Sequence, residues 1–233
     1  MNLIIPLAGR DPRFTTFKPF IPFHGKPLIY HVVAQHQLQH GDKLIFILLQ
    51  EHETQYNASK KLIELFGKEI IIRILENETQ GAPSSILLGA RDLIDNDEPI
   101  LIELADVLRD LQPFYEDIKN VSNSIAGIIP VQENMNIVDR PWGYVYIDKQ
   151  GNVAELKEKQ FITKPERATM GLYYFSKGHD FVKAAKLMIE KNSFIYKNNY
   201  FVGPVYNELI SEGKNVMTYH VKIHQILDPT NLI

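Results

Sequence analysis

The chain has 233 residues, 45% of them hydrophobic, and is long enough to bury a full-sized core without a disulfide or structural metal. It contains no cysteine, which excludes a disulfide framework, a cysteine zinc site and a cysteine nucleophile. The 25 basic and 28 acidic residues leave a net charge of −3, which does not favour nucleic acid as a general partner. The opening MNLIIPLAGR has too short an apolar run for a signal peptide or membrane span, so we expect a cytoplasmic protein without membrane insertion.

Strands and helices alternate in the first half of the chain. Near-continuous apolar runs predict strands at 2–7, 43–49 and 99–105, and a weaker one at 69–75. Between them lie segments with helical periodicity, the first beginning near Pro27. The residues expected to share helix faces are Leu28, Ile29, Val32 and Val33; Leu62, Ile63 and Phe66; and Ile86, Leu87, Ala90, Leu93 and Ile94. This order predicts an α/β fold of the doubly wound type, with a mostly parallel central sheet flanked by helices on both faces.

The pattern changes after about residue 110. The predicted elements are strands at 124–131, 143–147, 153–157 and 168–175, then helices near 178–191 and 203–212. The segment 148–152, DKQGN, predicts a hairpin in which Gly151 is available for a positive φ. We expect this half to cover one edge of the sheet. Because no repeat, low-complexity tract or linker interrupts the chain, we expect residues 1–233 to form one domain.

The stretch from Pro6 to Ile29 predicts an anion site. A short apolar strand runs into a loop that carries Gly9, Arg10, Arg13 and Lys18, and a helix follows. Backbone N–H groups, cationic side chains and a helix N-terminus can then converge on one phosphate chain. A nucleotide or another polyphosphate is therefore the leading ligand.

Two further features fall where strands of an open α/β sheet place ligands, at their carboxyl ends. Asp106 follows the apolar run LIELA and can hold Mg²⁺, which prefers oxygen ligands shared with phosphates; alternatively, it caps the next turn. Gln80 and Gly81 lie in TQGAPSS at a helix start. They can read the edge of a base, or they can be the ordinary residues of a helix start.

Three further polar features are candidate site residues, and each has a structural alternative or lacks a partner that the site would need. Glu158 and Lys159 follow a strand, where Lys159 can clamp a substrate phosphate or form a surface ion pair. Asp228 follows an apolar pair near the C-terminus. It can be a second carboxylate ligand of the metal, or it can start a turn. His36 and His40 have the spacing of a helical ligand pair, but no third zinc ligand is evident.

Taken together, seven segments in this order resemble the sugar-phosphate nucleotidyltransferases, the glucose-1-phosphate thymidylyltransferase-like and uridylyltransferase-like enzymes. They are PLAGRDPRF, FKPFIPFHGKPLI, TQGAPSSILLGA, LIELAD, YVYIDKQGNVAELKEK, ATMGLYYF and ILDPTNL. The resemblance extends from Met1 almost to Ile233. It implies a Rossmann-like nucleotidyltransferase fold in the short form of the family, with a nucleotide-binding half at 1–110 and a sugar-phosphate-binding half at 111–233.

The resemblance also implies roles for residues. Arg13, Lys18 and Asp106 match catalytic positions. The implied nucleotide contacts are Leu7, Ala8, Gly9, Arg10, Gln80 and Gly81; the implied sugar-phosphate contacts are Gly143, Glu158, Lys159 and Gly171; the implied magnesium carboxylates are Asp106 and Asp228. The implied reaction joins a nucleoside triphosphate to a sugar 1-phosphate, with Mg²⁺, for nucleotide-sugar and surface polysaccharide synthesis. Relatives are often homo-oligomers.

The chain departs from the family pattern in its opening loop. The usual G-G-x-G-T-R or A-G-x-G-S-R reads A-G-R-D-P-R here, so Asp11 and Pro12 stand where a Gly and a small hydroxyl residue are expected. A carboxylate and a missing N–H are both unfavourable in a triphosphate cradle. Two alternatives therefore stand beside the sugar enzyme. One is a catalytically weak protein that binds nucleotides or sugar phosphates; the other is a cytidylyltransferase acting on a non-sugar phosphomonoester.

Overall fold

The computed structural model describes residues 1–11, 14, 16–105, 107–133, 142–159, 167–193 and 196–227. The elements of the first half are β1 (Asn2–Pro6), η1 (Lys18–Phe20), β2 (Pro22–Phe23), β3 (Lys26–Pro27), α1 (Leu28–Ala34), β4 (Lys43–Leu49), α2 (Gln50–Tyr56), α3 (Ala58–Phe66), β5 (Ile71–Leu75), α4 (Ala82–Ile94), β6 (Ile100–Glu103) and β7 (Val107–Asp110). The four strands predicted here are confirmed as β1, β4, β5 and β6. The first helix begins at Leu28, directly after Pro27, as predicted. Leu62 is buried, whereas Ile63, which was expected on the same helix face, is 38% exposed.

The second half contains α5 (Gln112–Asp117), η2 (Ile118–Asn120), β8 (Ile125–Glu133), β9 (Gly143–Ile147), β10 (Val153–Glu158), β11 (Arg167–Thr169), β12 (Leu172–Phe175), α6 (Gly178–Glu190), α7 (Val205–Ser211), β13 (Asn215–His220) and β14 (Lys222–Ile226). The hairpin at 148–152 is confirmed, with Gly151 at φ 88°. The single strand predicted at 168–175 is wrong. The chain turns at Gly171, where φ is 71°, and forms β11 and β12 instead.

The central sheet has the strand order β10-β9-β11-β8-β12-β6-β1-β4-β5, and β13 pairs with β8. Strands β6, β1, β4 and β5 are parallel. Strand β12 runs antiparallel to both β6 and β8. The sheet is therefore mixed rather than mostly parallel, and the second half extends it instead of covering its edge. Strands β11 and β12 lie on either side of β8 and both run antiparallel to it, so the short link through Gly171 moves the chain across β8 without reversing its direction.

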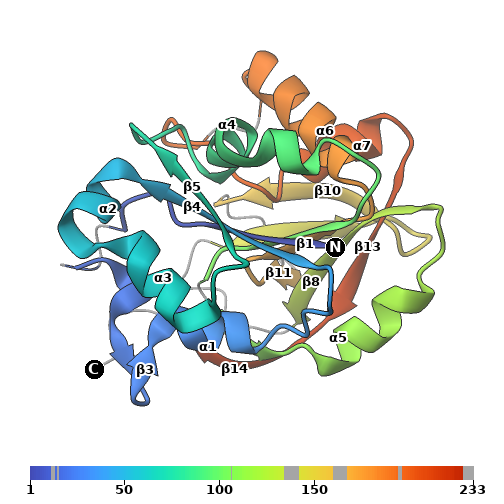
Figure 1. The fold of residues 1–233 in the computed structure, drawn as a ribbon. Helices are drawn as coiled ribbons and strands as arrows, with labels where there is room; N and C mark the ends of the chain where they lie inside the picture. The colour runs from blue at the N-terminus through green and yellow to red at the C-terminus, as the bar shows by residue number, and fades with distance from the viewer. Residues whose placement is uncertain are drawn as a thin grey trace.

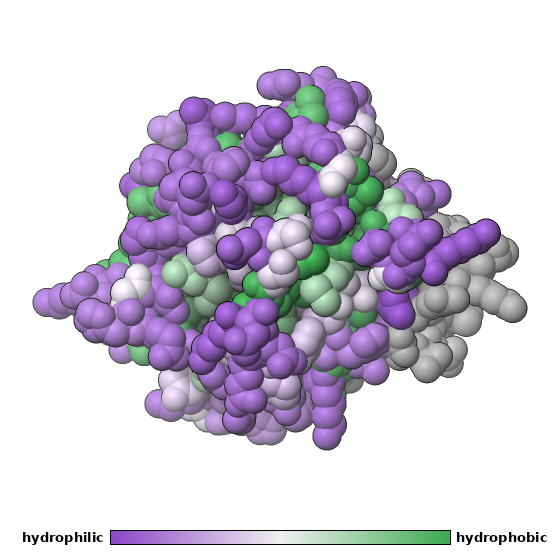
Figure 2. All heavy atoms as spheres, turned by 90° about the vertical axis from the view of Figure 1, so that its right-hand side faces the viewer, coloured by the Kyte–Doolittle hydropathy of each residue, from purple (hydrophilic) through white to green (hydrophobic). Residues whose placement is uncertain are grey.

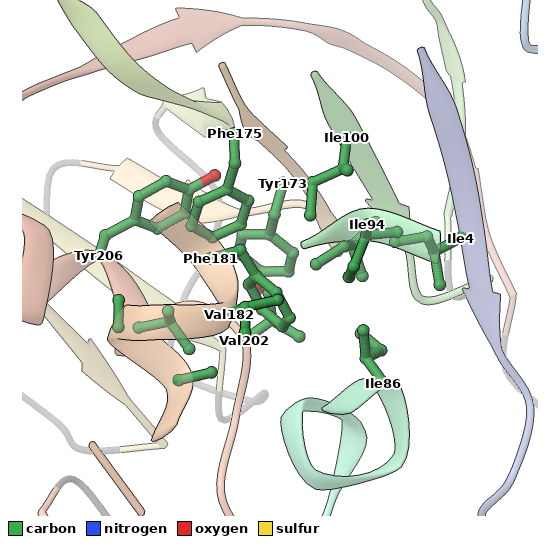
Figure 3. Packing of buried hydrophobic residues seen from close by; sticks show 14 of the residues in the cluster. Ile4, Ile86, Ile94, Ile100, Tyr173, Phe175, Phe181, Val182, Val202 and Tyr206 are labelled. Atoms are coloured by element: carbon green, nitrogen blue, oxygen red, sulfur yellow. The ribbon is translucent and has the colours of Figure 1, made fainter. Parts of the chain in front are cut away.

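Two hydrophobic layers sandwich the sheet. Helices α4, α6 and α7 lie on one side of it and α1, α3 and α5 on the other (Figure 1). Ile4 belongs to the first layer, and its neighbours Leu3 and Ile5 belong to the second, as the alternation of a strand requires. In the first layer the rings of Phe175 and Tyr206 stack with centroids 4.3 Å apart (Figure 3). The α/β class with flanking helices is confirmed.

The face turned toward the viewer in Figure 2 is mainly hydrophilic, with a narrower band of hydrophobic residues across its middle. Within the described ranges, no helix combines the length and apolar content that a membrane span needs.

Candidate functional site

A cavity of about 710 Å³ opens at the carboxyl end of β1. Its walls come from the loop after β1, from η1 and α2, from the start of α4 and from the segment 199–202. The predicted site residues that line it are Leu7, Ala8, Gly9, Arg10, Lys18 and Gly81. The structure thus brings the opening loop and the segment around Gly81 to one place, although four strands and three α-helices separate them along the chain. This volume is in the range of small-molecule sites.

Local packing fixes the described residues on either side of the opening loop, Leu7 after β1 and Phe17 before Lys18 of η1. The N–H of Leu7 donates to the carbonyl of Ile47, 2.8 Å away, so the loop leaves β1 beside β4. Phe17 is buried and stacks on the ring of His52 in α2, with centroids 4.0 Å apart. Because Phe17 is anchored, Lys18 follows at the cavity wall. Burial lowers the pKa of His52 and so favours a neutral ring in this stack.

Arg10 was predicted to contact the nucleotide, and the structure pairs its side chain with an acid. The guanidinium donates two hydrogen bonds to Glu51, at 2.9 and 2.5 Å. The hydrogen bond from Arg10 lowers the pKa of Glu51. The backbone N–H of Arg10 donates to Glu78, 3.2 Å away. Glu51 and Glu78 line the cavity, and neither was predicted from the sequence to be a site residue. Glu51 could have been found from its place just beyond the 43–49 strand.

A glycine is required at position 81 because the backbone of Tyr200 approaches it closely. It begins α4 with φ 99°, and a Cβ there would lie 2.1 Å from the carbonyl oxygen of Tyr200. The N–H of Tyr200 donates to the carbonyl of Gln80, 2.9 Å away. The side chain of Gln80 donates to Asn198 at 3.3 Å and does not line the cavity. Gly81 therefore holds segment 199–202 against α4 and forms the cavity wall from both.

We expect Gly81→Ala to lower the free energy of unfolding by about 2–4 kcal/mol, because the substitution adds both a positive-φ penalty and a clash with backbone. Gly151→Ala is the matched control. Gly151 has a φ of 88°, but no atom lies within 4 Å of the place that a Cβ would take, so only the penalty of about 1–2 kcal/mol applies. Urea unfolding measures both. Equal losses in the two variants would contradict the role of the close approach.

The predicted sugar-phosphate contacts lie beside this cavity, at one end of β9 and β10. Gly143 and Glu158 face each other across the strand pair, and Lys159 follows at φ 56°. A Cβ on Gly143 would lie 2.6 Å from Oε2 of Glu158, so a glycine gives that carboxylate its space. The ammonium of Lys159 lies 3.6 Å from Oε1 of Glu158 and 5.6 Å from the ring centroid of Phe201.

Phe201 connects this group to the cavity, because it belongs to segment 199–202 of the cavity wall. Gly171 reaches the cavity by a second route: its carbonyl accepts the N–H of Leu104 at 2.8 Å, and Leu104 is also a lining residue. The structure thus places Lys159 and Gly171 next to lining residues of the cavity, Phe201 and Leu104, without placing the predicted acceptor residues in its wall. No sequence pattern distinguishes Phe201 from the other aromatic residues of the chain.

Arg13, Asp106 and Asp228 lie outside the described residues. The strands beside the two carboxylates are described. Strand β7 starts at Val107, and β14 ends at Ile226; the two strands are antiparallel, with Val107 opposite Ile226. Asp106 is one residue before that pair and Asp228 two residues after it along the chain. Ala105, just before Asp106, lines the cavity.

Across the described ranges, no group of three or more His, Asp or Glu residues is arranged to hold a metal. His36, from the spaced pair His36 and His40, is buried and uses both ring nitrogens: Nδ1 is 2.8 Å from the hydroxyl of Tyr115 and Nε2 is 3.2 Å from Glu103. Burial lowers the pKa of His36.

Comparison with known proteins gives one family. Residues 14–223 match the family profile described as nucleotidyl transferase. Among curated proteins, the bifunctional protein GlmU of Methanocaldococcus jannaschii is 25% identical over 182 residues, 76% of this chain and 40% of the relative. GlmU of Methanococcus aeolicus is 25% identical over 185 residues, 75% of this chain and 40% of the relative. The chain therefore spans about 40% of the length of these curated relatives.

Solved structures share the fold over nearly the whole chain. The nucleoside-diphosphate-sugar pyrophosphorylase from Vibrio cholerae RC9 superimposes with a TM-score of 0.78 at 21% identity, covering 99% of this chain and 97% of that one. The inositol-1-phosphate CTP transferase from T. maritima has a TM-score of 0.72 at 15% identity, with 100% and 91% covered. At these identities the likeness concerns the fold.

Proposed function

The chain belongs to the nucleotidyl transferase family, and on that premise we propose that it joins a nucleoside triphosphate to a sugar 1-phosphate and releases pyrophosphate. The observation that carries the proposal is the cavity of about 710 Å³ at the carboxyl end of β1, where the opening loop, Lys18 and Gly81 meet. Open α/β sheets bind their ligands at this edge. The structures named as a nucleoside-diphosphate-sugar pyrophosphorylase and a UDP-glucose pyrophosphorylase support this substrate class.

Mg²⁺ suits the donors that this chain offers. The register of β7 and β14 brings the described neighbours of Asp106 and Asp228 to the same end of one two-stranded ribbon. Two carboxylates leave room for phosphate oxygens, and a hard cation such as Mg²⁺ prefers this kind of incomplete oxygen set. We propose that Asp106 and Asp228 hold it. Bound there, it would neutralise negative charge on the phosphates during transfer.

The protein's own residues would bind and align the substrates. An oxygen of the acceptor phosphate bonds to the α-phosphorus, the bond to the bridging oxygen breaks, and the electron pair leaves with pyrophosphate. The attacking oxygen is already ionised, so alignment and charge stabilisation are the main requirements. Arg13 and Lys18 would contact the triphosphate, and the backbone of Leu7, Ala8, Gly9 and Gly81 would approach the nucleoside. On the acceptor side, Lys159 would hold the phosphate, beside Gly143, Glu158 and Gly171.

A panel assay tests the proposal. Purified protein with Mg²⁺ would receive each common nucleoside triphosphate with sugar 1-phosphates, inositol 1-phosphate or phosphocholine, and pyrophosphate release would be followed. Release with a sugar 1-phosphate supports the proposal. Release only with the other acceptors would show that the acceptor is a different phosphomonoester.

A second candidate, a binding protein without turnover, is favoured by the acidic wall of the cavity, which contains Asp11, Glu51 and Glu78. Triphosphate binding without release from any pair would establish that candidate.

Replacing Lys159 by Met removes the proposed clamp on the acceptor phosphate. We expect KM for the acceptor to rise about 10- to 100-fold, the value of one hydrogen bond to a charged group, while triphosphate binding is unchanged. Lys157→Met is the control, because Lys157 lies on β10, two residues before Lys159, and pairs with Glu155 at 3.3 Å. Steady-state kinetics with each substrate varied measures the effect. An equal rise in both variants would remove Lys159 from the acceptor site.

A further inference from the structure

A buried ion cluster lies behind the turn between β6 and β7. We define the Glu103 cluster as Gln35, His36, Glu103, Arg109 and Tyr115. The guanidinium of Arg109 donates two hydrogen bonds to the carboxylate of Glu103, at 2.9 and 3.3 Å. The side chains of both residues, and that of His36, are 0% exposed. Gln35 Nε2 also donates to Glu103, at 3.2 Å.

Stability of the fold alone does not explain this buried ion pair. Removing two charges from water carries a large desolvation penalty, and apolar residues of similar volume often stabilise a core equally well or better. The two charged residues stand within six positions of each other on β6 and β7, at the end of the sheet that carries the cavity. Their location therefore points to a role at this edge.

The cluster holds the backbone on both sides of position 106. On one side, the N–H of Ala105 donates to Oε1 of Glu103 at 2.9 Å. On the other side, the carbonyl of Val107 accepts a hydrogen bond from Nη2 of Arg109 at 3.0 Å. Gln35 completes the arrangement, because its Oε1 accepts the backbone N–H of Arg109 at 3.0 Å. One carboxylate and one guanidinium, bonded to each other, thus fix both neighbours of the proposed metal ligand.

The turn also needs such support. Ala105 has φ 59°, in the left-handed region that residues with a Cβ rarely occupy. A strained residue persists where its surroundings determine its conformation, and such residues concentrate at functional sites. Here the hydrogen bond to Glu103 supplies that determination, and the N–H of the preceding residue, Leu104, is held by the carbonyl of Gly171 at 2.8 Å.

We propose that the Glu103 cluster is a positioning device for the metal carboxylate at 106: it fixes Ala105 and Val107, the two chain neighbours of Asp106, and so sets the affinity of the site for a divalent cation. The inference rests on the proposed function, since that assigns the metal role. The residues of the cluster act through the turn and need not touch a substrate. Supporting residues of this kind typically change metal affinity or activity by about 10- to 100-fold.

A charge-balanced double variant, Glu103→Leu with Arg109→Met, separates positioning from stability. Both charges leave together, so no buried charge loses its partner. The matched control is Glu208→Leu with Lys191→Met, which removes an ion pair of 2.7 Å whose carboxylate is also buried, between α7 and the end of α6. We expect both double variants to unfold in one cooperative thermal transition.

Mn²⁺ serves as the probe, and its binding is measured by electron paramagnetic resonance in the presence of UTP. We expect about tenfold or more weaker Mn²⁺ binding in the Glu103 and Arg109 double variant than in the control, with UTP binding in EDTA equal in the two. Where a sugar 1-phosphate is turned over, kcat should fall and KM for the acceptor should stay constant. If the double variant does not fold, Gln35→Met, which removes no charge, receives the same measurements.

Folded variants that hold Mn²⁺ as tightly as the control overturn the inference, and so does a wild-type protein that binds no Mn²⁺. The proposed function fails by a different result, the absence of pyrophosphate release from every substrate pair by the wild-type protein. Because Mn²⁺ binding is measured without turnover, the two failures are distinguishable.

Discussion

We expect Asp106→Asn to lower kcat for pyrophosphate release by about 10²- to 10³-fold or more, the magnitude seen when one charge-stabilising group is removed from an active site. The amide keeps the size of the side chain and loses its negative charge, so it is a poor ligand for Mg²⁺. The negative charge that grows on the pyrophosphate is then left without its counter-ion. Neither neighbour of Asp106 needs to move, because Ala105 and Val107 are held by Glu103 and Arg109.

The matched control for this experiment is Asp110→Asn. Asp110 lies on β7, four residues further along, and its exposed carboxylate accepts the N–H of Gln112 at 3.2 Å. The control should keep its kcat, and both variants should melt like the wild-type protein. Pyrophosphate release at saturating substrates and UTP binding in EDTA complete the measurement. An Asp106→Asn protein with undiminished kcat refutes the metal role of that carboxylate.

Strands β1, β4 and β6 could be predicted because they are buried on both faces. Runs such as 43–49 are almost wholly apolar, and β4 is buried from Leu44 to Leu49. The direction of the later strands was not accessible in this way. Strand β12 runs antiparallel to both β6 and β8, and an apolar run does not reveal such pairings. A single glycine in that run also gives too little signal to split 168–175 into two strands.

The strand β14 was missed because its pattern is weak. Its sequence KIHQI has only two apolar residues, and its pairing with β7 depends on a partner in a distant part of the chain. This pairing is nevertheless what links the chain positions of Asp106 and Asp228. The resemblance suggested both residues, whereas the reason they can act together lies in a register between distant segments.

For the candidate site, the sequence indicates which residues lie at the cavity but not which hydrogen bonds their side chains form. The positions of Gly9, Lys18 and Gly81 at one cavity follow from the rule that ligands lie at strand ends. The rule says nothing of pairing, so Arg10 was expected at the nucleotide although Glu51 receives both of its hydrogen bonds. The Glu103 cluster was invisible for the same reason, because Gln35, His36 and Arg109 are brought to Glu103 only by the packing of α1 against β7.

Arg109→Met, made alone, should lower the free energy of unfolding at pH 7 by about 3–5 kcal/mol, the cost of leaving one buried charge without its partner. In the wild-type protein, burial acts to raise the pKa of Glu103, but Arg109, His36 and the N–H of Ala105 outweigh it and the pKa is lowered from 4.5. Without Arg109, burial dominates, and the pKa of Glu103 should rise above that value.

The pH dependence of the loss gives the decisive comparison. In the wild-type protein the pKa of Glu103 is lowered, so its contribution to stability is present above the unfolded-state value and is lost as the pH falls. In Arg109→Met the raised pKa reverses this: the carboxyl is tolerated when protonated, and stability is lost as the pH rises through the folded-state pKa. A proton on His36, 3.2 Å from Glu103, would offset the same charge.

The deficit in the free energy of unfolding of Arg109→Met, relative to the wild-type protein, should therefore shrink from pH 7 to pH 5 in urea unfolding. The charge-balanced double variant should show almost no deficit at either pH. A deficit that is constant with pH would mean that Arg109 stabilises the fold by packing, and that the charge of Glu103 is not what it balances.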